Sequence, residues 1–205
     1  MSTTRKRRDD LISPEAGKPV RPSPTDAAVT RLNWGCGTHP QPGWINSDIK
    51  ECPGIDISCD IRQGIPLDDG SLDYIVSIHA LPMISYPDLV PVLEELRRLL
   101  KPGGVLRLAL PDARRGIRAL LDGDRDHFLV PDDEVRSLGG KFVVHMLWYG
   151  YSVTMFTDDF IEELLEKAGF SRVTHCRFSQ TASRWPEIVE LDNREHESLF
   201  VEAVK

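Results

Sequence analysis

The chain of 205 residues contains no long hydrophobic run and little cysteine. No apolar stretch approaches the roughly 20 residues that a membrane-spanning helix needs. No apolar core follows the charged N-terminus, as a secretory signal would require. The four cysteines form no Cys-x-x-Cys pair, so we expect four reduced thiols. These absences predict a cytoplasmic protein that has no membrane partner.

Positive charge is also scarce, with 25 basic residues against 32 acidic ones. Six of the basic and four of the acidic residues lie in the first thirty, so the remainder carries a net charge of −9. Nucleic-acid binding depends on basic surface, and we therefore expect no nucleic-acid partner. Residues 1–28 contain four prolines and few large apolar side chains, which predicts a flexible arm before a single domain at 29–205.

Short apolar runs alternate with amphipathic segments from residue 30 onward. Strands are expected near 31–35, 44–48, 55–59, 73–78, 104–109, 172–178 and 198–204, and helices near 88–101, 111–121 and 158–168. Asp88 and Thr157 are the expected N-caps. The alternation predicts an α/β fold whose mostly parallel sheet has helices on both faces. Residues 36–72 leave little room for the usual crossover helices, whereas 122–157 is longer than a crossover needs.

A glycine turn links the first two apolar runs. The first run ends in Gly35-Cys36-Gly37, and the second ends in Asp48. Glycine permits positive φ and lets backbone approach a ligand closely. A carboxylate after the second strand is placed to accept hydrogen bonds from ribose hydroxyls. The pattern predicts a nucleoside site, although a turn cap is the alternative role for Asp48.

The spacing differs from that of the dinucleotide fingerprint. Pro40 occupies the position of its third glycine, and Asp48 comes only eleven residues after Gly37. The fingerprint places its acid about 20 residues on, and its pyrophosphate lies on a helix N-terminus. The spacing favours a nucleoside without a pyrophosphate and disfavours a nicotinamide oxidoreductase.

Three segments resemble class I S-adenosylmethionine (SAM)-dependent methyltransferases. Leu32-Asn-Trp-Gly-Cys-Gly37 resembles their first motif, residues 96–108 are similar to the Leu-Lys-Pro-Gly-Gly segment before their fifth strand, and residues 167–170 resemble the Ala-Gly-Phe that closes a later helix. The matches occur in the family's order. The resemblance implies a Rossmann-like sheet of seven strands with the last one antiparallel, an insertion after the fifth strand, and SAM as methyl donor.

The resemblance also implies a set of cofactor contacts. Asn33 stands where the family usually has an aspartate, so a carboxylate near the methionine amino group is missing. Asp60 is expected at the adenine, with a surface acid as the alternative. The expected cofactor-binding residues are Asn33, Gly35, Cys36, Gly37, Asp48, Asp60, Ile61 and His79.

Two histidines are candidates for catalysis, because an alcohol acceptor holds its proton and a base then helps. His79 follows the fourth strand, at the edge where the transferred methyl should lie. His145 lies in an aromatic stretch, 142–151, of the insertion at about 122–157. An insertion there overhangs the ligand-binding edge of the sheet, so we expect it to bind the acceptor. Packed histidines and a structural decoration are the alternatives.

The C-terminal segment bears on the acceptor. Residues 190–194 and 197–202 resemble small methyltransferases of glycan assembly, which implies O-methylation of a saccharide and Mg²⁺ dependence. Asp112, Glu190, Asp192 and Glu195 offer oxygen ligands, but no spacing is diagnostic and the metal site stays open. A phenol, acid or amine acceptor, a non-catalytic SAM-binding protein, and a homodimer also remain open.

Overall fold

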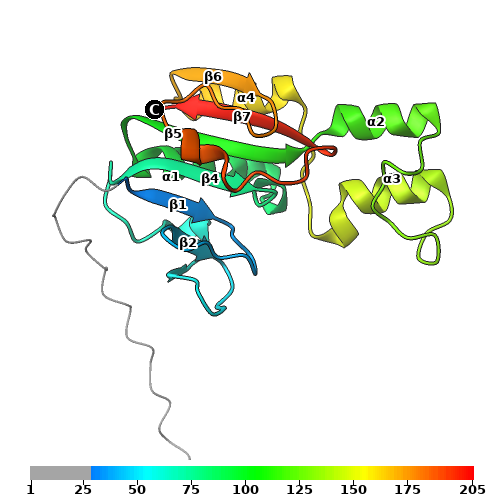
Figure 1. Cartoon of the computed structure of the whole chain (residues 1–205), viewed down its shortest axis with the longest axis horizontal. Helices are drawn as coiled ribbons and strands as arrows, with labels where there is room; N and C mark the ends of the chain where they lie inside the picture. Colours follow the sequence, from blue (N-terminus) through cyan, green and yellow to red (C-terminus); the bar gives the residue numbers. More distant parts are fainter. Residues whose placement is uncertain (1–28) are drawn as a thin grey trace, which may run out of the picture.

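The computed structural model describes residues 29–205, so the arm predicted for 1–28 lies outside the described residues. A seven-stranded sheet has the order β3-β2-β1-β4-β5-β7-β6 (Figure 1). Its strands are β1 (Arg31–Trp34), β2 (Ile45–Asp48), β3 (Ile57–Ser58), β4 (Leu72–Ile78), β5 (Leu100–Pro111), β6 (Arg172–Cys176) and β7 (Ser198–Val204). Strand β7 is antiparallel to both neighbours, and the other pairs are parallel. This confirms the predicted strands and fold class.

Helices are concentrated in the second half of the chain. The α-helices are α1 (Leu89–Leu99), α2 (Ala113–Asp122), α3 (Leu138–Met146) and α4 (Asp158–Lys167). Short 3₁₀ helices are η1 (Ile61–Gln63), η2 (Leu81–Met83), η3 (Tyr86–Asp88), η4 (Trp148–Gly150) and η5 (Pro186–Val189). Among the described residues no α-helix connects β1 to β2 or β2 to β3, as the short intervening segments predicted.

The two expected N-caps occupy their positions, but neither side chain caps its helix. Asp88 already has helical backbone angles because η3 runs into α1, and its carboxylate accepts a hydrogen bond from Ser85 Oγ at 2.8 Å. Thr157 precedes α4 in an extended conformation and also makes no capping bond. The helix starts were therefore predicted correctly, while the capping chemistry was not.

One face of the sheet packs against α1 and α4. Alternate residues of the central strands, such as Leu32, Ile75 and Leu108, join leucines of both helices in the main core. Burying each such side chain contributes roughly 1.5–3 kcal/mol. This layer holds β1, β4 and β5 in place, and the ends of these strands position the site.

The opposite face is covered differently. Trp44, Tyr74 and Ile188 form a second core there, and Ile188 comes from η5 in the segment between β6 and β7. Arg107 is fully buried on this face and pairs with Asp192 at 2.5 Å and Glu202 at 2.7 Å. Both faces of the sheet are therefore covered, as predicted. On this second face the cover is an irregular segment with a 3₁₀ helix, because the links after β1 and β2 are too short for α-helices.

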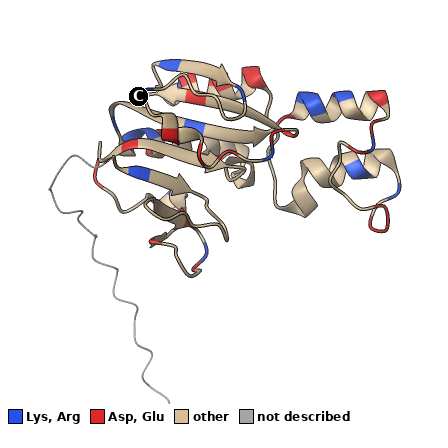
Figure 2. Cartoon of the chain, in the orientation of Figure 1, with Lys and Arg blue, Asp and Glu red and all other residues tan. Residues whose placement is uncertain are grey.

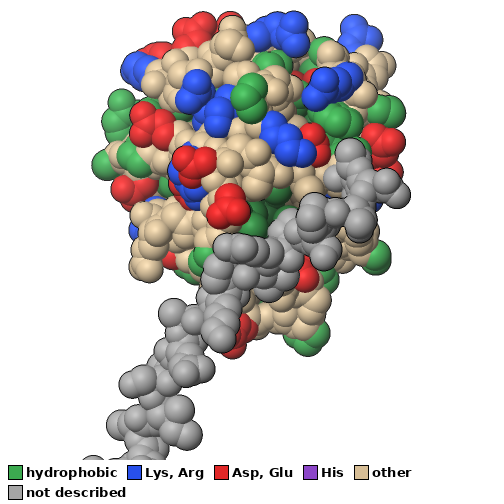
Figure 3. All heavy atoms as spheres, turned by 90° about the vertical axis from the view of Figure 1, so that its left-hand side faces the viewer, with side chains coloured by type: hydrophobic (Ala, Val, Ile, Leu, Met, Phe, Trp, Pro, Cys, Tyr) green, Lys and Arg blue, Asp and Glu red, His purple; other side chains and the backbone are tan. Residues whose placement is uncertain are grey.

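Helices α2 and α3 pack on each other and extend beyond the C-terminal end of β5 (Figure 1). Helix α2 corresponds to the helix expected at 111–121, and α3 lies within the insertion expected at about 122–157. Acidic and basic residues are interspersed along the chain and on the face drawn in Figure 3 (Figures 2 and 3). Within residues 29–205, every helix is too short or too polar to span a bilayer.

Candidate cofactor and methyl-transfer site

The glycine turn after β1 is held against β2. The amides of Gly35 and Cys36 both donate to the carbonyl of Ser47, at 2.8 and 3.1 Å. Gly35 and Gly37 have φ values of +69° and +57°, a region that favours glycine. The predicted turn is therefore formed by two backbone conformations that other residues adopt at a cost.

Gly35 also brings two loops into direct contact. A Cβ built on it would lie 2.2 Å from the Cβ of Ala80, which follows β4. A Cβ on Gly37 would meet nothing within 4 Å. The turn thus packs on the β4 loop at Gly35 and leaves open space at Gly37, as a ligand cradle requires.

We expect Gly35→Ala to destabilise the fold by about 1–3 kcal/mol, from overpacking and a strained φ. Gly37→Ala is the matched control, because it carries the φ cost without the collision. Chemical denaturation measures both. Adding Ala80→Gly to Gly35→Ala should recover part of the loss, and an additive double variant would show that the two loops are not in contact.

Asp48 ends β2 beside this turn. One carboxylate oxygen accepts from the amide of Gly37 at 2.8 Å, and the other accepts from the amide of Lys50 at 3.0 Å. Each carboxylate oxygen has two lone pairs, so one on each remains for a ligand. Asp48 is thereby fixed with two free acceptor positions, which suits a ribose diol.

Asn33 lies beneath the turn and is buried. Its amide donates to Asn46 Oδ1 at 3.2 Å and to the carbonyl of His39 at 3.5 Å. Asn46 in turn accepts from the amide of Gln41 at 2.8 Å. The predicted contact Asn33 therefore supports the shape of the turn in this structure.

The remaining predicted cofactor residues are mostly committed to protein contacts. Burial, together with nearby Asp48, raises the pKa of the Cys36 thiol. Asp60 caps η1 and pairs with Arg62 at 2.6 Å, and this hydrogen bond holds the pKa of its carboxyl below the usual value. The Ile61 side chain belongs to the main core, so only its backbone is placed to meet an adenine.

His79 follows β4 with a positive φ of +56°. Its amide donates to the carbonyl of Ala109 at 2.9 Å, and its Nε2 lies 2.8 Å from Ser198 Oγ. Burial lowers the pKa of His79 to about 4, so the ring is neutral near pH 7. Among residues 29–205 no group hydrogen-bonds its Nδ1. A non-glycine residue at positive φ is a strained conformation of the kind found at functional sites.

His145, the other catalytic candidate, has both ring nitrogens occupied. Nδ1 accepts from the amide of Leu129 at 3.2 Å, and Nε2 lies 3.1 Å from Glu197 Oε2. Because Nδ1 is an acceptor, Nε2 carries the proton and donates it to the carboxylate. In this arrangement His145 has no lone pair with which to take a proton from an acceptor.

The structure adds a group of residues that the sequence did not reveal. Glu197 accepts from Arg194 at 2.9 Å as well as from His145. Burial alone would raise the pKa of Glu197, but these two hydrogen bonds lower it to about 2. The rings of His127 and His196 lie 5.4 Å apart beside this cluster. The i, i+3 spacing of Arg194 and Glu197 is the only local signal for it.

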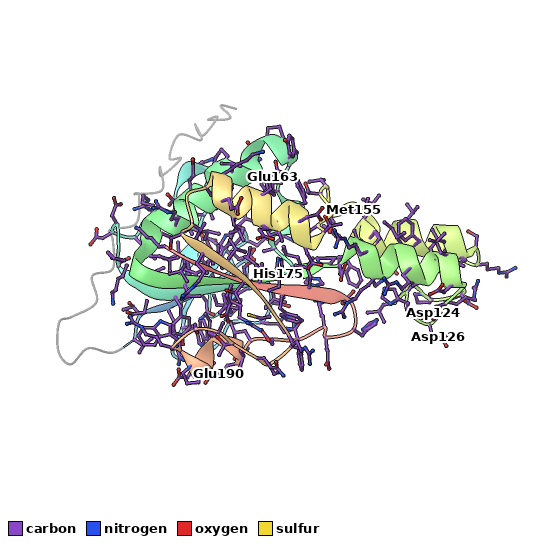
Figure 4. All side chains as sticks on the ribbon, turned by 90° about the horizontal axis from the view of Figure 1, so that it is seen from above. Asp124, Asp126, Met155, Glu163, His175 and Glu190 are labelled. Atoms are coloured by element: carbon purple, nitrogen blue, oxygen red, sulfur yellow. The ribbon has the colours of Figure 1, made fainter. Side chains whose placement is uncertain are left out.

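A cavity of about 330 Å³ opens beside β6 and β7, close to the start of α4. His175 lies on its wall, below α4 (Figure 4). Charge or an aromatic ring is supplied to this wall by Asp112, Arg115, Asp158, His175, Arg177, Phe178, Glu195 and Phe200. Ser198, whose hydroxyl contacts His79, also lines it. The cavity therefore offers donors, acceptors and an aromatic ring close to the end of β4.

The carboxylates considered as magnesium ligands are dispersed or engaged. Asp192 is held by Arg107, and Glu190 lies 3.4 Å from Arg31. Across residues 29–205, no group of three or more histidine, cysteine or acidic side chains has a geometry that could hold a metal ion. Nothing in this arrangement supports a magnesium site.

Comparison with known proteins agrees with the fold. Residues 32–108 match the family model described as a methyltransferase domain. A possible histamine N-methyltransferase from Thermotoga maritima superposes with a TM-score of 0.54 at 18% identity, covering 86% of this chain and 82% of that one. A SAM-dependent methyltransferase from Archaeoglobus fulgidus gives 0.54 at 14%, covering 87% of each chain. No curated protein matches the sequence.

The strand order is that of the class I methyltransferase fold, and residues 32–108 match a methyltransferase domain. The residues of the site fit SAM, because the turn leaves open space at Gly37 and Asp48 keeps two free acceptor positions.

Proposed function

We propose that the protein methylates a hydroxyl group of a small polyhydroxylated acceptor, with a saccharide as the leading class. The observation that carries this proposal is the polar cavity next to the His79–Ser198 pair. Carboxylates and guanidinium groups on one wall suit sugar hydroxyls, and Phe178 suits the apolar face of a sugar ring. The mixed charge favours a small molecule over a nucleic acid.

In this proposal Asp48 binds the ribose hydroxyls of SAM, and the cradle at Gly35 receives its amino-acid part. When bound, SAM supplies an electrophilic methyl group on a sulfonium. The chain's own contribution is to hold the acceptor oxygen in line with that methyl, since positioning accounts for much of the rate in such a displacement.

His79 is the base in this mechanism. Its Nε2 carries the proton and donates it to Ser198 Oγ, which leaves Nδ1 free to accept a proton from the acceptor hydroxyl. SAM held at Asp48 and the glycine turn would supply the methyl group to the acceptor oxygen, while His79 Nδ1 would take up the proton that this oxygen gives up. His145 takes no part in this transfer, because Glu197 and Leu129 occupy its nitrogens.

The resemblance of residues 190–194 and 197–202 points to a more specific acceptor. Small methyltransferases of glycan assembly include a sugar 1-O-methyltransferase of methylmannose polysaccharide synthesis, and a short mannoside is therefore the first acceptor to test. Magnesium dependence is part of the same resemblance. Because Asp192 and Glu190 are engaged by arginines, we expect equal rates with magnesium and with a chelator.

A radiolabelled methyl-transfer screen tests this proposal. Saccharides, phenols, carboxylic acids and amines are incubated with labelled SAM and the full chain, with Mg²⁺ or with a chelator. We expect label in saccharides, mannosides first. Transfer only to an amine, phenol or acid would overturn the acceptor class. Binding of SAM without transfer to any class would indicate a non-catalytic SAM-binding protein.

A further inference from the structure

Glu197 immediately precedes β7 and is only 3% exposed as a side chain. Its two carboxylate oxygens accept from different partners, Oε2 from His145 and Oε1 from Arg194. A buried carboxylate is costly unless it is paired, so this position is specified by its neighbours. The proposed mechanism leaves this group without a role.

His145 and Arg194 both connect Glu197 to the insertion, residues 122–157. His145 lies in α3 and accepts from the amide of Leu129, so one ring joins two parts of the insertion to the carboxylate. The guanidinium of Arg194 lies 5.1 Å from the ring centre of Trp148, which belongs to η4. Glu197 is thus one of the points at which the insertion is joined to the sheet, together with the hydrogen bond between His196 and the carbonyl of His127.

Glu197 also acts on the opposite side, at the end of β4. The next residue, Ser198, hydrogen-bonds His79 at 2.8 Å. Burial lowers the pKa of His79 most, Arg194 and His145 lower it further, and Glu197 is the group that raises it and so favours the protonated ring. A negative charge here stabilises an imidazolium at the moment the base has taken its proton.

We propose that Glu197 is a positioning residue for methyl transfer: it ties the insertion at residues 122–157 to the start of β7 and supplies the counter-charge for His79. This rests on the proposed function, in which His79 accepts a proton from the acceptor. One carboxylate then serves both the position of the insertion and the charge balance of the base.

Three variants of the full chain separate these roles. Glu197→Gln removes the charge and keeps the shape, whereas Glu197→Asp keeps the charge and withdraws it from His145 by one methylene. Glu202→Gln is the matched control, since it removes a similarly buried carboxylate from β7, the strand that follows Glu197, where it pairs with Arg107. Any effect of general destabilisation should appear in the control as well.

Two measurements without acceptor give the result. Both Glu197 variants weaken the charge-assisted hydrogen bond that holds the His145 ring. Hydrogen exchange at the Leu129 amide, which donates to that ring, should therefore speed up by about tenfold or more. In a ¹⁵N-resolved NMR titration, the pKa of His79 should fall in Glu197→Gln and stay close to wild type in Glu197→Asp. Glu202→Gln should change neither.

The proposal is overturned if Glu197→Gln matches Glu202→Gln in both measurements. If Glu197→Gln does not fold, Glu197→Asp carries the test, and unchanged exchange at Leu129 overturns the proposal. Calorimetric titration with SAM keeps the two proposals apart. If the wild-type protein does not bind SAM, the proposed function is refuted. If it binds SAM but Glu197→Gln matches Glu202→Gln in both measurements, only the role of Glu197 is refuted.

Discussion

Asp48→Ala should abolish the rise in melting temperature that SAM or S-adenosylhomocysteine gives the wild-type protein. Its carboxylate is held by the amides of Gly37 and Lys50 with two acceptor positions free, and alanine offers none. A ligand at 100 times its Kd stabilises the folded state by about 2.7 kcal/mol. For a chain of this size, that corresponds to a shift of roughly 5–10 °C, which differential scanning fluorimetry resolves.

Two controls sharpen this experiment. NAD should give no shift with the wild-type protein, because the turn lacks the third glycine and the longer spacing of the dinucleotide fingerprint. Asp60→Ala should weaken the shift only in part, since the Asp60 carboxylate is already paired with Arg62. A full shift in Asp48→Ala would mean that the ribose binds elsewhere.

His79→Ala should lower kcat by about 10²-fold while SAM still binds. The expected loss lies at the lower end of the range for general bases, because a pKa of about 4 keeps the ring unprotonated but makes it a weak proton acceptor. The pKa is lowered, so His79 stays active as pH falls until about pH 4. An ordinary histidine would lose activity near pH 6.5. Stopped assays with the saccharide acceptor from pH 4 to pH 8 measure both effects.

His145→Ala distinguishes the two histidines. It removes a link between the insertion and Glu197 and leaves His79 in place, so we expect a higher KM for the acceptor, with the pH profile retained. A loss of kcat equal to that of His79→Ala, with unchanged KM, would instead assign the base to His145. Full activity in His79→Ala would exclude His79 from proton transfer.

Local sequence patterns predicted the elements that depend on local physics. The leucine spacing of α1, the glycine after α4 and the alternating apolar runs each correspond to an element in the structure. Helix α3 was not predicted, because Gly139 and Gly140 near its start are poor helix formers. It begins nevertheless, since Ser137 accepts from the amide of Gly140 at 3.2 Å and caps it.

For the site as well, the sequence predicted contacts between residues that are close in the chain and missed those between distant residues. Gly35 follows β1 and Asp48 ends the neighbouring strand β2, so their spacing in sequence reflects their spacing in space. The pairing of His145 with Glu197 joins residues 52 positions apart, and no local pattern encodes it. Ile61 fits the family's position for adenine, but its side chain packs in the main core.

A crystal structure of the protein with S-adenosylhomocysteine tests the central claim most directly. The account predicts that both ribose hydroxyls donate to the carboxylate of Asp48 and that the amino-acid part lies on the backbone at Gly35. Electron density for the nucleoside away from the ends of β1 and β2, with the Asp48 side chain turned toward solvent, would contradict it.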